Sequence, residues 1–124
     1  MWSHGSFHWN ELMTRDPERA KTFYGDTIGW SFDRMPMGDM TYWVAKVGEK
    51  PVGGIFEMKG AEFDNVPPNW MSYLAVDDVD ARLKKAVAAG ATTMRPPFDV
   101  PGVGRIAILR EPWGSVIGWI TPSS

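Results

Sequence analysis

The chain contains no cysteine among its 124 residues. A disulfide framework, a thiolate metal site and a cysteine nucleophile are therefore excluded. Long apolar runs are also missing, because no stretch approaches the roughly eighteen apolar residues of a membrane span. The N-terminus has neither the basic start nor the apolar segment of a signal peptide. We therefore expect a cytoplasmic protein that does not contact a membrane.

Positive charge is not in excess either, since 13 Lys and Arg face 15 Asp and Glu and the net charge is -2. Binding to a phosphate backbone needs a basic surface, so nucleic acid is not an expected partner. Histidine is scarce, and His4 and His8 are the two imidazoles. General-base chemistry by histidine would have to use one of them, and we expect both to be structural or solvated.

Large apolar side chains are abundant by contrast. Hydrophobic residues make up 44% and charged residues 23% of the chain, which is ordinary usage for one globular domain. The 7 Trp and 8 Met, however, exceed what a small core needs. We therefore expect several of them to line a cavity or an interface.

An internal repeat organises the sequence. A shift of half the chain length places Trp9 on Met71, Leu12 on Leu74 and Asp16 on Asp78. Alternation and turn residues then predict a strand, a helix and three further strands in each half. The predicted strands cover residues 7–14, 29–32, 40–47, 52–58, 70–76, 91–94, 105–110 and 115–121. We expect one domain over residues 1–124, with module one at about 6–58, a linker at about 59–69 and module two at about 70–122.

The helix starts and loops carry clear signals. Asp16 followed by Pro17 is typical of an N-cap and first helical position, and Asp77 or Asp78 has the same role in the second half. Gly90 suits the left-handed position after the second helix. The pair Gly38-Asp39 predicts a turn, and the segment 95–104 is rich in proline and glycine, so we expect a loop there that covers a site.

These features together resemble the glyoxalase, bleomycin-resistance and extradiol-dioxygenase superfamily, also called the vicinal oxygen chelate (VOC) fold. The segments that carry the resemblance are Trp9-x-Glu11-Leu12, Asp16-Pro17-x-x-Ala20-x-x-Phe23-Tyr24, Gly29-Trp30, Val76-Asp77-Asp78 and Glu111-Pro112-x-Gly114-x-Val116-Ile117-Gly118-Trp119. The resemblance implies an α+β fold in which two βαβββ modules form a cupped mixed β-sheet with the helices on its outer face. It also implies that modules pair within one chain or between two, and we expect a homodimer.

Many enzymes of this superfamily hold a divalent metal in the cup, on the first and last strand of each module. The resemblance places those positions at Trp9, Phe56, Met71 and Gly118, and none of these residues is a good ligand for such a cation. A shift of one residue gives His8, Glu57, Ser72 and Trp119, with only two good ligands. We therefore expect no metal and no other cofactor.

Alternation along the first strand puts Trp9, Glu11 and Met13 on one face, and the repeat adds Met71 and Tyr73. If this face is the cup, its flat rings can stack on a planar ligand or hold a cation, and otherwise they fill a core. The predicted ligand-binding residues are Trp9, Glu11, Trp43, Phe56, Met71 and Tyr73.

Glu11 is the candidate catalytic residue, because a carboxylate on an apolar face is costly unless it is paired. Three roles remain open for it. The first is structural pairing with Lys46, Arg105, Arg110 or the backbone. The second is recognition of a cationic ligand, and the third is proton transfer.

Three functions follow from these expectations. The leading one is metal-free binding of a small aromatic or cationic molecule. The second is a superfamily enzyme, either a metal-dependent lyase or isomerase or a dioxygenase, and the third is a non-catalytic dimeric interaction protein. The sequence leaves open whether the chain is an enzyme.

Overall fold

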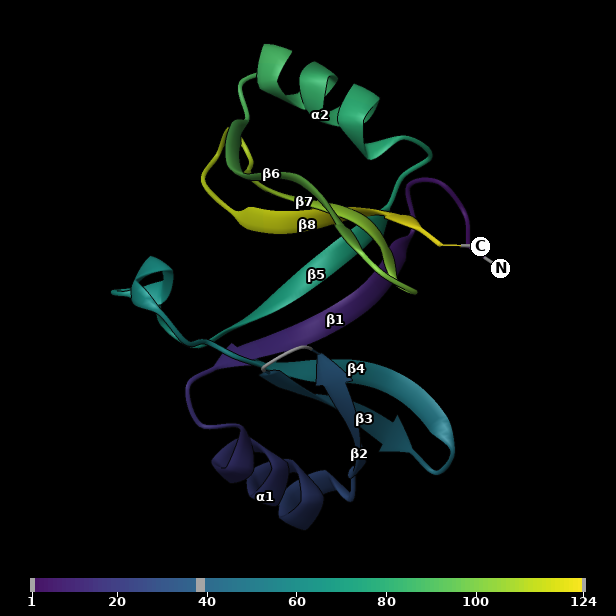
Figure 1. Ribbon diagram of the computed structural model, residues 1–124, viewed down its shortest axis with the longest axis vertical. Coiled ribbons are helices and arrows are strands. Elements are labelled where there is room, and N and C mark those ends of the chain that lie inside the picture. Colours follow the sequence, from purple (N-terminus) through teal and green to yellow (C-terminus); the bar gives the residue numbers. More distant parts are fainter. Residues whose placement is uncertain (1, 38–39, 124) are drawn as a thin grey trace. The chain divides into compact units, whose positions relative to one another are not determined.

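The computed structural model describes residues 2–37 and 40–123. The predicted turn at Gly38-Asp39 lies outside these residues. Along the chain the elements are β1 (Phe7–Thr14), α1 (Pro17–Ile28), β2 (Ser31–Met37), β3 (Met40–Val47), β4 (Lys50–Glu57), the 3-10 helix η1 (Ala61–Phe63), β5 (Asn69–Ala75), α2 (Val79–Ala88), β6 (Thr92–Val100), β7 (Gly104–Arg110) and β8 (Val116–Pro122) (Figure 1). The order βαβββ therefore occurs twice, as the repeat predicts.

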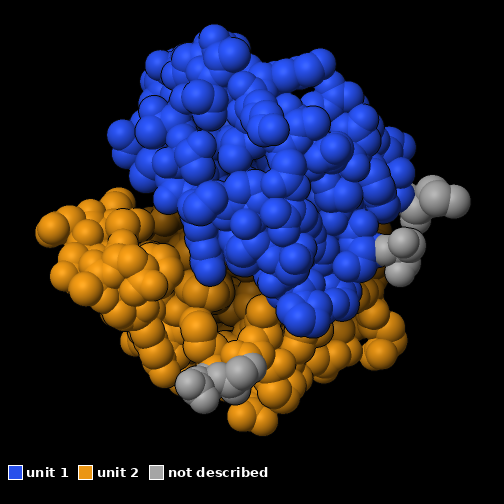
Figure 2. Space-filling model, turned by 45° about the horizontal axis from the view of Figure 1, so that its top comes forward, with its two compact units in different colours: residues 1–9, 71–124 blue, residues 10–70 orange. Residues whose placement is uncertain are grey.

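Two compact units are distinguished by colour in Figure 2. One comprises residues 10–70, and the other comprises residues 1–9 together with 71–124. In the first module the strands follow the order β2-β3-β4-β1, and in the second the order β5-β8-β7-β6. β1 is parallel to β4 and β5 is parallel to β8, whereas the remaining pairs in each module are antiparallel. Mixed sheets with one helix per module confirm the predicted α+β class.

Both helices begin where the sequence predicts. The side chain of Asp16 accepts a hydrogen bond from the backbone N–H of Arg19 at 3.1 Å, and Pro17 follows at the first helical position. In the second module Asp78, rather than Asp77, is the N-cap, and it accepts from the N–H of Ala81 at 3.1 Å. Each cap satisfies a backbone donor that the first helical turn leaves without a partner.

The second module has a core between α2 and its sheet. Val79 and Leu83 on α2 are buried against Ala107 and Leu109 on β7. The N–H of Val79 also donates to the Thr121 hydroxyl on β8 at 2.9 Å, so the start of the helix is tied to the last strand. Burial of this apolar stripe stabilises the packing of the helix on one face of the sheet.

The proline-rich segment after α2 differs from the prediction. β6 continues to Val100 and pairs with β7, so most of the expected loop is a strand. Proline removes a ladder donor but is tolerated on an edge strand, and β6 is at the edge of its sheet. The register shifts between Arg95 and Phe98 accommodate Pro96 and Pro97.

Within the described residues, neither helix has the length and apolar character that a membrane crossing requires.

Candidate functional site

Each module has one sheet face that its helix covers and another that we call the helix-free face. In the second module the helix-free face is built from β5, β6, β7 and β8, with the first residues of β1. Its buried residues are Tyr73, Ile106 and Ile120, and its partly buried ones are Trp9, Met71, Phe98, Val100 and Ile108. Three of the predicted ligand-binding residues, Trp9, Met71 and Tyr73, thus lie together on an apolar face.

The packing of its ring against a glycine fixes Tyr73 on this face. Tyr73 is directly opposite Gly118 in the parallel pair of β5 and β8. Its ring lies over Gly118, where a built Cβ atom would overlap with ring atoms of Tyr73. Because Gly118 has no side chain, the aromatic ring of Tyr73 can lie flat against the last strand.

The first module repeats this arrangement with other residues. In the parallel pair of β1 and β4, Glu11 is opposite Gly54 and Met13 is opposite Phe56, so these side chains share the helix-free face. The phenol of Tyr42 on β3 occupies the space that a side chain at Gly54 would fill. Glu11 therefore takes the place in the first module that Tyr73 takes in the second.

Glu11 is a buried carboxylate with only 8% of its surface exposed. It takes part in interactions within the structure. Two cations that the sequence offers as partners of Glu11 pair with other carboxylates. Lys46 pairs with Asp33 at 2.9 Å, and Arg105 pairs with Asp80 at 2.7 Å. A buried carboxylate at this position can accept hydrogen bonds, attract a cation or exchange a proton.

Phe56 borders the same face beside the linker. Its ring packs edge-on against Phe63 of η1, with the two centroids 5.9 Å apart. The carbonyl of Phe63 accepts a hydrogen bond from the Arg15 guanidinium at 2.6 Å. The linker is thus anchored to Arg15, which directly follows β1, and it supports one of the predicted ligand-binding rings.

The structure does not bring Trp43 to this face. Trp43 is opposite Ile55 in the pair of β3 and β4, and Ile55 is opposite Leu12, so all three point to the helix side. The Lys21 ammonium of α1 lies 3.0 Å from the centroid of the Trp43 ring. Trp43 therefore packs under α1 through a cation–π contact, on the side of the sheet opposite to Glu11 and Phe56.

Two residues of the helix-free faces were not predicted from the sequence. Tyr42 is the neighbour of Trp43, and the direction of its side chain depends on the register of β3, which the sequence does not indicate. Phe98 lies in the segment predicted as a loop, yet it packs on the helix-free face with the Arg95 guanidinium 3.7 Å from its ring centroid. Alternating residues in 95–100 are a signal that could have identified Phe98.

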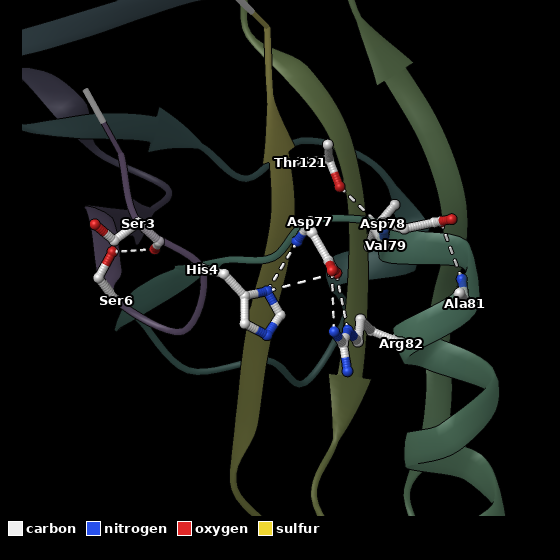
Figure 3. Close-up of polar contacts among 9 residues, drawn as sticks. All are labelled: Ser3, His4, Ser6, Asp77, Asp78, Val79, Ala81, Arg82 and Thr121. Atoms are coloured by element: carbon white, nitrogen blue, oxygen red, sulfur yellow. Dashed lines mark hydrogen bonds and ion pairs between the residues drawn. The ribbon is translucent and has the colours of Figure 1, made fainter.

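His4 has the structural role that we expect from the sequence. Figure 3 shows His4 and Arg82 pointing toward Asp77. His4 Nδ1 accepts a hydrogen bond from the backbone N–H of Asp77 at 3.0 Å, and the Arg82 guanidinium makes two hydrogen bonds to the carboxylate. Arg82 holds the pKa of Asp77 well below its usual value. His8 is exposed on β1.

The four positions that the resemblance assigns to a metal carry side chains that do not fit one. The positions implied by the resemblance are Trp9, Phe56, Met71 and Gly118, which offer no imidazole or carboxylate. Within residues 2–37 and 40–123, no three side chains of the types His, Asp and Glu gather closely enough to hold a metal ion.

Comparison with known proteins agrees with this architecture. The profile of the Glyoxalase/Bleomycin resistance protein/Dioxygenase superfamily matches residues 6–118. A Mycobacterium bovis protein named "Putative glyoxylase CFP32" is 38% identical over 96% of this chain and 45% of its own length. The anthracycline biosynthesis protein DnrV of Streptomyces peucetius is 35% identical over 90% of this chain and 39% of its own length. The chain thus spans less than half of either relative.

A solved structure shows the same fold at low identity. Methylmalonyl-CoA epimerase of Streptomyces coelicolor, in complex with 2-nitronate-propionyl-CoA, aligns over 98% of this chain and 100% of its own with a TM-score of 0.72 and 14% identity. The profile covers nearly all of the sequence, and the structural alignment agrees in fold. The chain therefore belongs to the Glyoxalase/Bleomycin resistance protein/Dioxygenase superfamily.

Proposed function

We propose that this chain binds a small planar aromatic cation without a metal. The binding residues are Glu11 and Phe56 on the helix-free face of the first module, and the second module offers an aromatic face of its own with Trp9, Met71 and Tyr73. The observation that carries the proposal is the chemistry of the first module's helix-free face, where the buried carboxylate of Glu11 shares its side of the sheet with Met13 and Phe56. Such surfaces stack on flat rings and attract positive charge.

The name of one relative supports the same class of ligand. DnrV is named for anthracycline biosynthesis, and anthracyclines are planar polycyclic molecules that carry an amino sugar. A molecule of this kind offers a flat face to Phe56 and an ammonium group to Glu11, which share one face of the first module. Hydrogen bonds to a charged group contribute about 1.5–3 kcal/mol, so the carboxylate supplies a measurable part of the affinity.

The proposal can be tested by calorimetric titration of the purified chain with doxorubicin, an anthracycline amine. We expect saturable binding, and we expect Glu11→Gln to weaken it by about 10-fold to 100-fold because a charge-assisted contact is lost. The matched control is Glu57→Gln, which removes a carboxylate from the same module. Glu57 follows Phe56 on β4, points to the other face and pairs with Lys59 at 3.7 Å.

A second probe separates charge recognition from stacking. An uncharged anthraquinone should bind wild type and Glu11→Gln equally, because it presents rings but no ammonium group. Circular dichroism of each variant checks that the fold is intact. Equal binding of doxorubicin by wild type and Glu11→Gln would remove Glu11 from recognition, and no binding of either probe would refute the proposal.

Metal analysis tests whether the chain binds its ligand without a metal. The chain, purified without chelators, should contain far less than one equivalent of Mn, Fe, Co, Ni or Zn by mass spectrometry. Its affinity for doxorubicin should not change after dialysis against EDTA. One equivalent of bound metal, together with turnover, would instead assign the chain to the metal-dependent enzymes of its superfamily.

A further inference from the structure

The linker, residues 59–68 between β4 and β5, is an exposed segment with the short helix η1 in its middle. Within it Phe63 and Val66 are half-buried, and the other residues are exposed. The turn of η1 is closed by local hydrogen bonds, such as the one that the N–H of Asp64 donates to the Ala61 carbonyl at 3.0 Å. Bonds of this kind hold η1 together as a unit but do not tie it to the sheet.

The residues on either side of the linker are fixed. Met58, which precedes it, is only 4% exposed, and its N–H donates to the Thr14 carbonyl at 2.8 Å. Trp70, which follows it closely, packs edge-on against Tyr24 and Trp30, with centroids 5.9 Å and 6.2 Å apart. The linker can therefore move between two fixed ends while the rest of the module stays folded.

Two backbone positions suited to a hinge bracket η1. Gly60 has a φ angle of +102° and Asn65 has a φ angle of +66°. Glycine adopts positive φ freely, and asparagine adopts it more readily than most residues with a side chain. A few such positions at the ends of an element can absorb the change in backbone angles that a hinge motion needs. η1 can thus turn as a unit between Gly60 and Asn65.

Phe63 makes two attachments between the linker and the module. Its carbonyl accepts a hydrogen bond from the Arg15 guanidinium at 2.6 Å, and its ring lies against Phe56, with an angle of 60° between the ring planes. Lys59 also pairs with Glu57 at 3.7 Å, but the Lys59 side chain is 60% exposed, and such pairs contribute little. The position of η1 therefore depends chiefly on one hydrogen bond and one aromatic contact, both made by Phe63.

The two attachments are weak enough to break at room temperature. A ring pair at this distance, and a hydrogen bond from an exposed guanidinium, each shift an equilibrium by up to about tenfold. The linker should therefore be closed in most molecules and open in roughly 1–10% of them, which is a typical population for a minor conformation.

We propose that Phe63 is a gate over the ligand-binding face of the first module. When η1 is closed, the Phe63 ring occupies part of the Phe56 surface on which a flat ligand stacks, and when η1 is open that surface is free. The inference rests on the proposed binding of a planar aromatic cation by Glu11 and Phe56. A ligand that binds only the open form has its affinity lowered by the fraction of open molecules, so Phe63 and Arg15 regulate this site without contacting the ligand.

Two variants open the gate in different ways. Phe63→Ala removes the ring that covers Phe56, and Arg15→Gln removes the hydrogen bond that holds η1. Each should bind doxorubicin more tightly than wild type, by about 10-fold for Phe63→Ala and about 3-fold to 10-fold for Arg15→Gln. The gain should lie in the association rate constant, measured by stopped-flow fluorescence of doxorubicin, because doxorubicin leaves from the open form in every variant. Changes in direct contacts alter the dissociation rate instead.

Arg19→Gln is the matched control for Arg15→Gln. It removes the same positive charge from the next turn of the chain, so a general gain in attraction for a cationic probe appears in both variants. Among the described residues, the Arg19 guanidinium is part of no ion pair, so its loss leaves no carboxylate without a partner. Circular dichroism checks that each variant is folded, which we expect because Phe63 is only half-buried and Arg15 is exposed.

Limited proteolysis follows the opening of the linker directly. Endoproteinase Glu-C cleaves after Glu62, which lies in η1. Doxorubicin should speed this cleavage in wild type, because it binds the open form and keeps the linker open. Phe63→Ala should be cleaved faster than wild type even without doxorubicin.

The outcomes separate the gate from the proposed function. Unchanged or weaker binding of doxorubicin by Phe63→Ala, a gain confined to dissociation, no larger gain in Arg15→Gln than in Arg19→Gln, or slower cleavage after Glu62 with doxorubicin would each overturn the gate alone. No binding of doxorubicin by wild type or by Phe63→Ala would refute the proposed function and this inference with it.

Discussion

Substitution of Gly118 by alanine tests how closely the Tyr73 ring packs against β8. A Cβ atom at Gly118 would overlap with Cδ1 and Cε1 of Tyr73, and Tyr73 is only 8% exposed. These ring atoms lie near the start of the side chain, so they cannot move aside without a change in the Tyr73 rotamer. We expect the ring to leave its place against β8 and the face to lose its packing.

The magnitude follows from two opposing effects. Overpacking in a closed core costs about 1–3 kcal/mol, whereas alanine in place of glycine stabilises by about 0.4–1 kcal/mol because it restricts the unfolded chain. The free energy of unfolding of Gly118→Ala should therefore fall by about 1–2 kcal/mol. Tyr73→Leu removes the overlapping ring atoms, so the cost of adding Gly118→Ala should be much smaller in that background.

Urea unfolding followed by circular dichroism measures these differences, and α1 supplies the matched control. Gly25 lies inside α1, and the one atom near its built Cβ is the Trp30 carbonyl oxygen at 3.6 Å, an ordinary contact distance. Gly25→Ala should raise the free energy of unfolding by about 0.5–1 kcal/mol. If Gly118→Ala is as stable as wild type to within about 0.5 kcal/mol, the proposed close packing of Tyr73 on β8 is refuted.

Three further predictions concern the second module. Leu83→Ala should lower the free energy of unfolding by about 2–5 kcal/mol because Leu83 is buried between α2 and its sheet, whereas Val87→Ala, at an exposed site, should change it little. Equal effects of the two substitutions in urea unfolding would contradict the burial of Leu83 in this core. Asp78→Ala should cost about 1 kcal/mol because it removes the N-cap of α2, and Asp78→Asn should recover most of that loss. Arg82 lowers the pKa of Asp77 from 3.8, so this pair stabilises the fold above about pH 4 and its contribution is lost as the pH falls below the unfolded value. The unfolding midpoint should therefore depend less on pH below pH 4 in Asp77→Asn than in wild type, and identical profiles would rule out this linkage.

The face that several candidate residues share could be predicted because strand alternation and the internal repeat are local properties. Trp9, Met71 and Tyr73 share a face as expected, and the shift that aligns the two halves correctly pairs Glu11 with Tyr73. Trp43 could not be placed in the same way. Whether Trp43 or Tyr42 faces the helix depends on how β3 pairs with β4. That register is set by contacts between the two strands, and no local sequence pattern indicates it.

The amino-acid sequence by itself determined the helix starts, the two βαβββ modules and the superfamily, because caps, periodicity and turn residues act within a few positions of the chain. Only the tertiary structure decided that the proline-rich segment continues β6, that Phe98 joins the apolar face and that Phe23 remains exposed on α1. These outcomes depend on which edge of a sheet a strand occupies and on what packs against each face. Both are set by contacts between residues far apart in the chain, which no local pattern records.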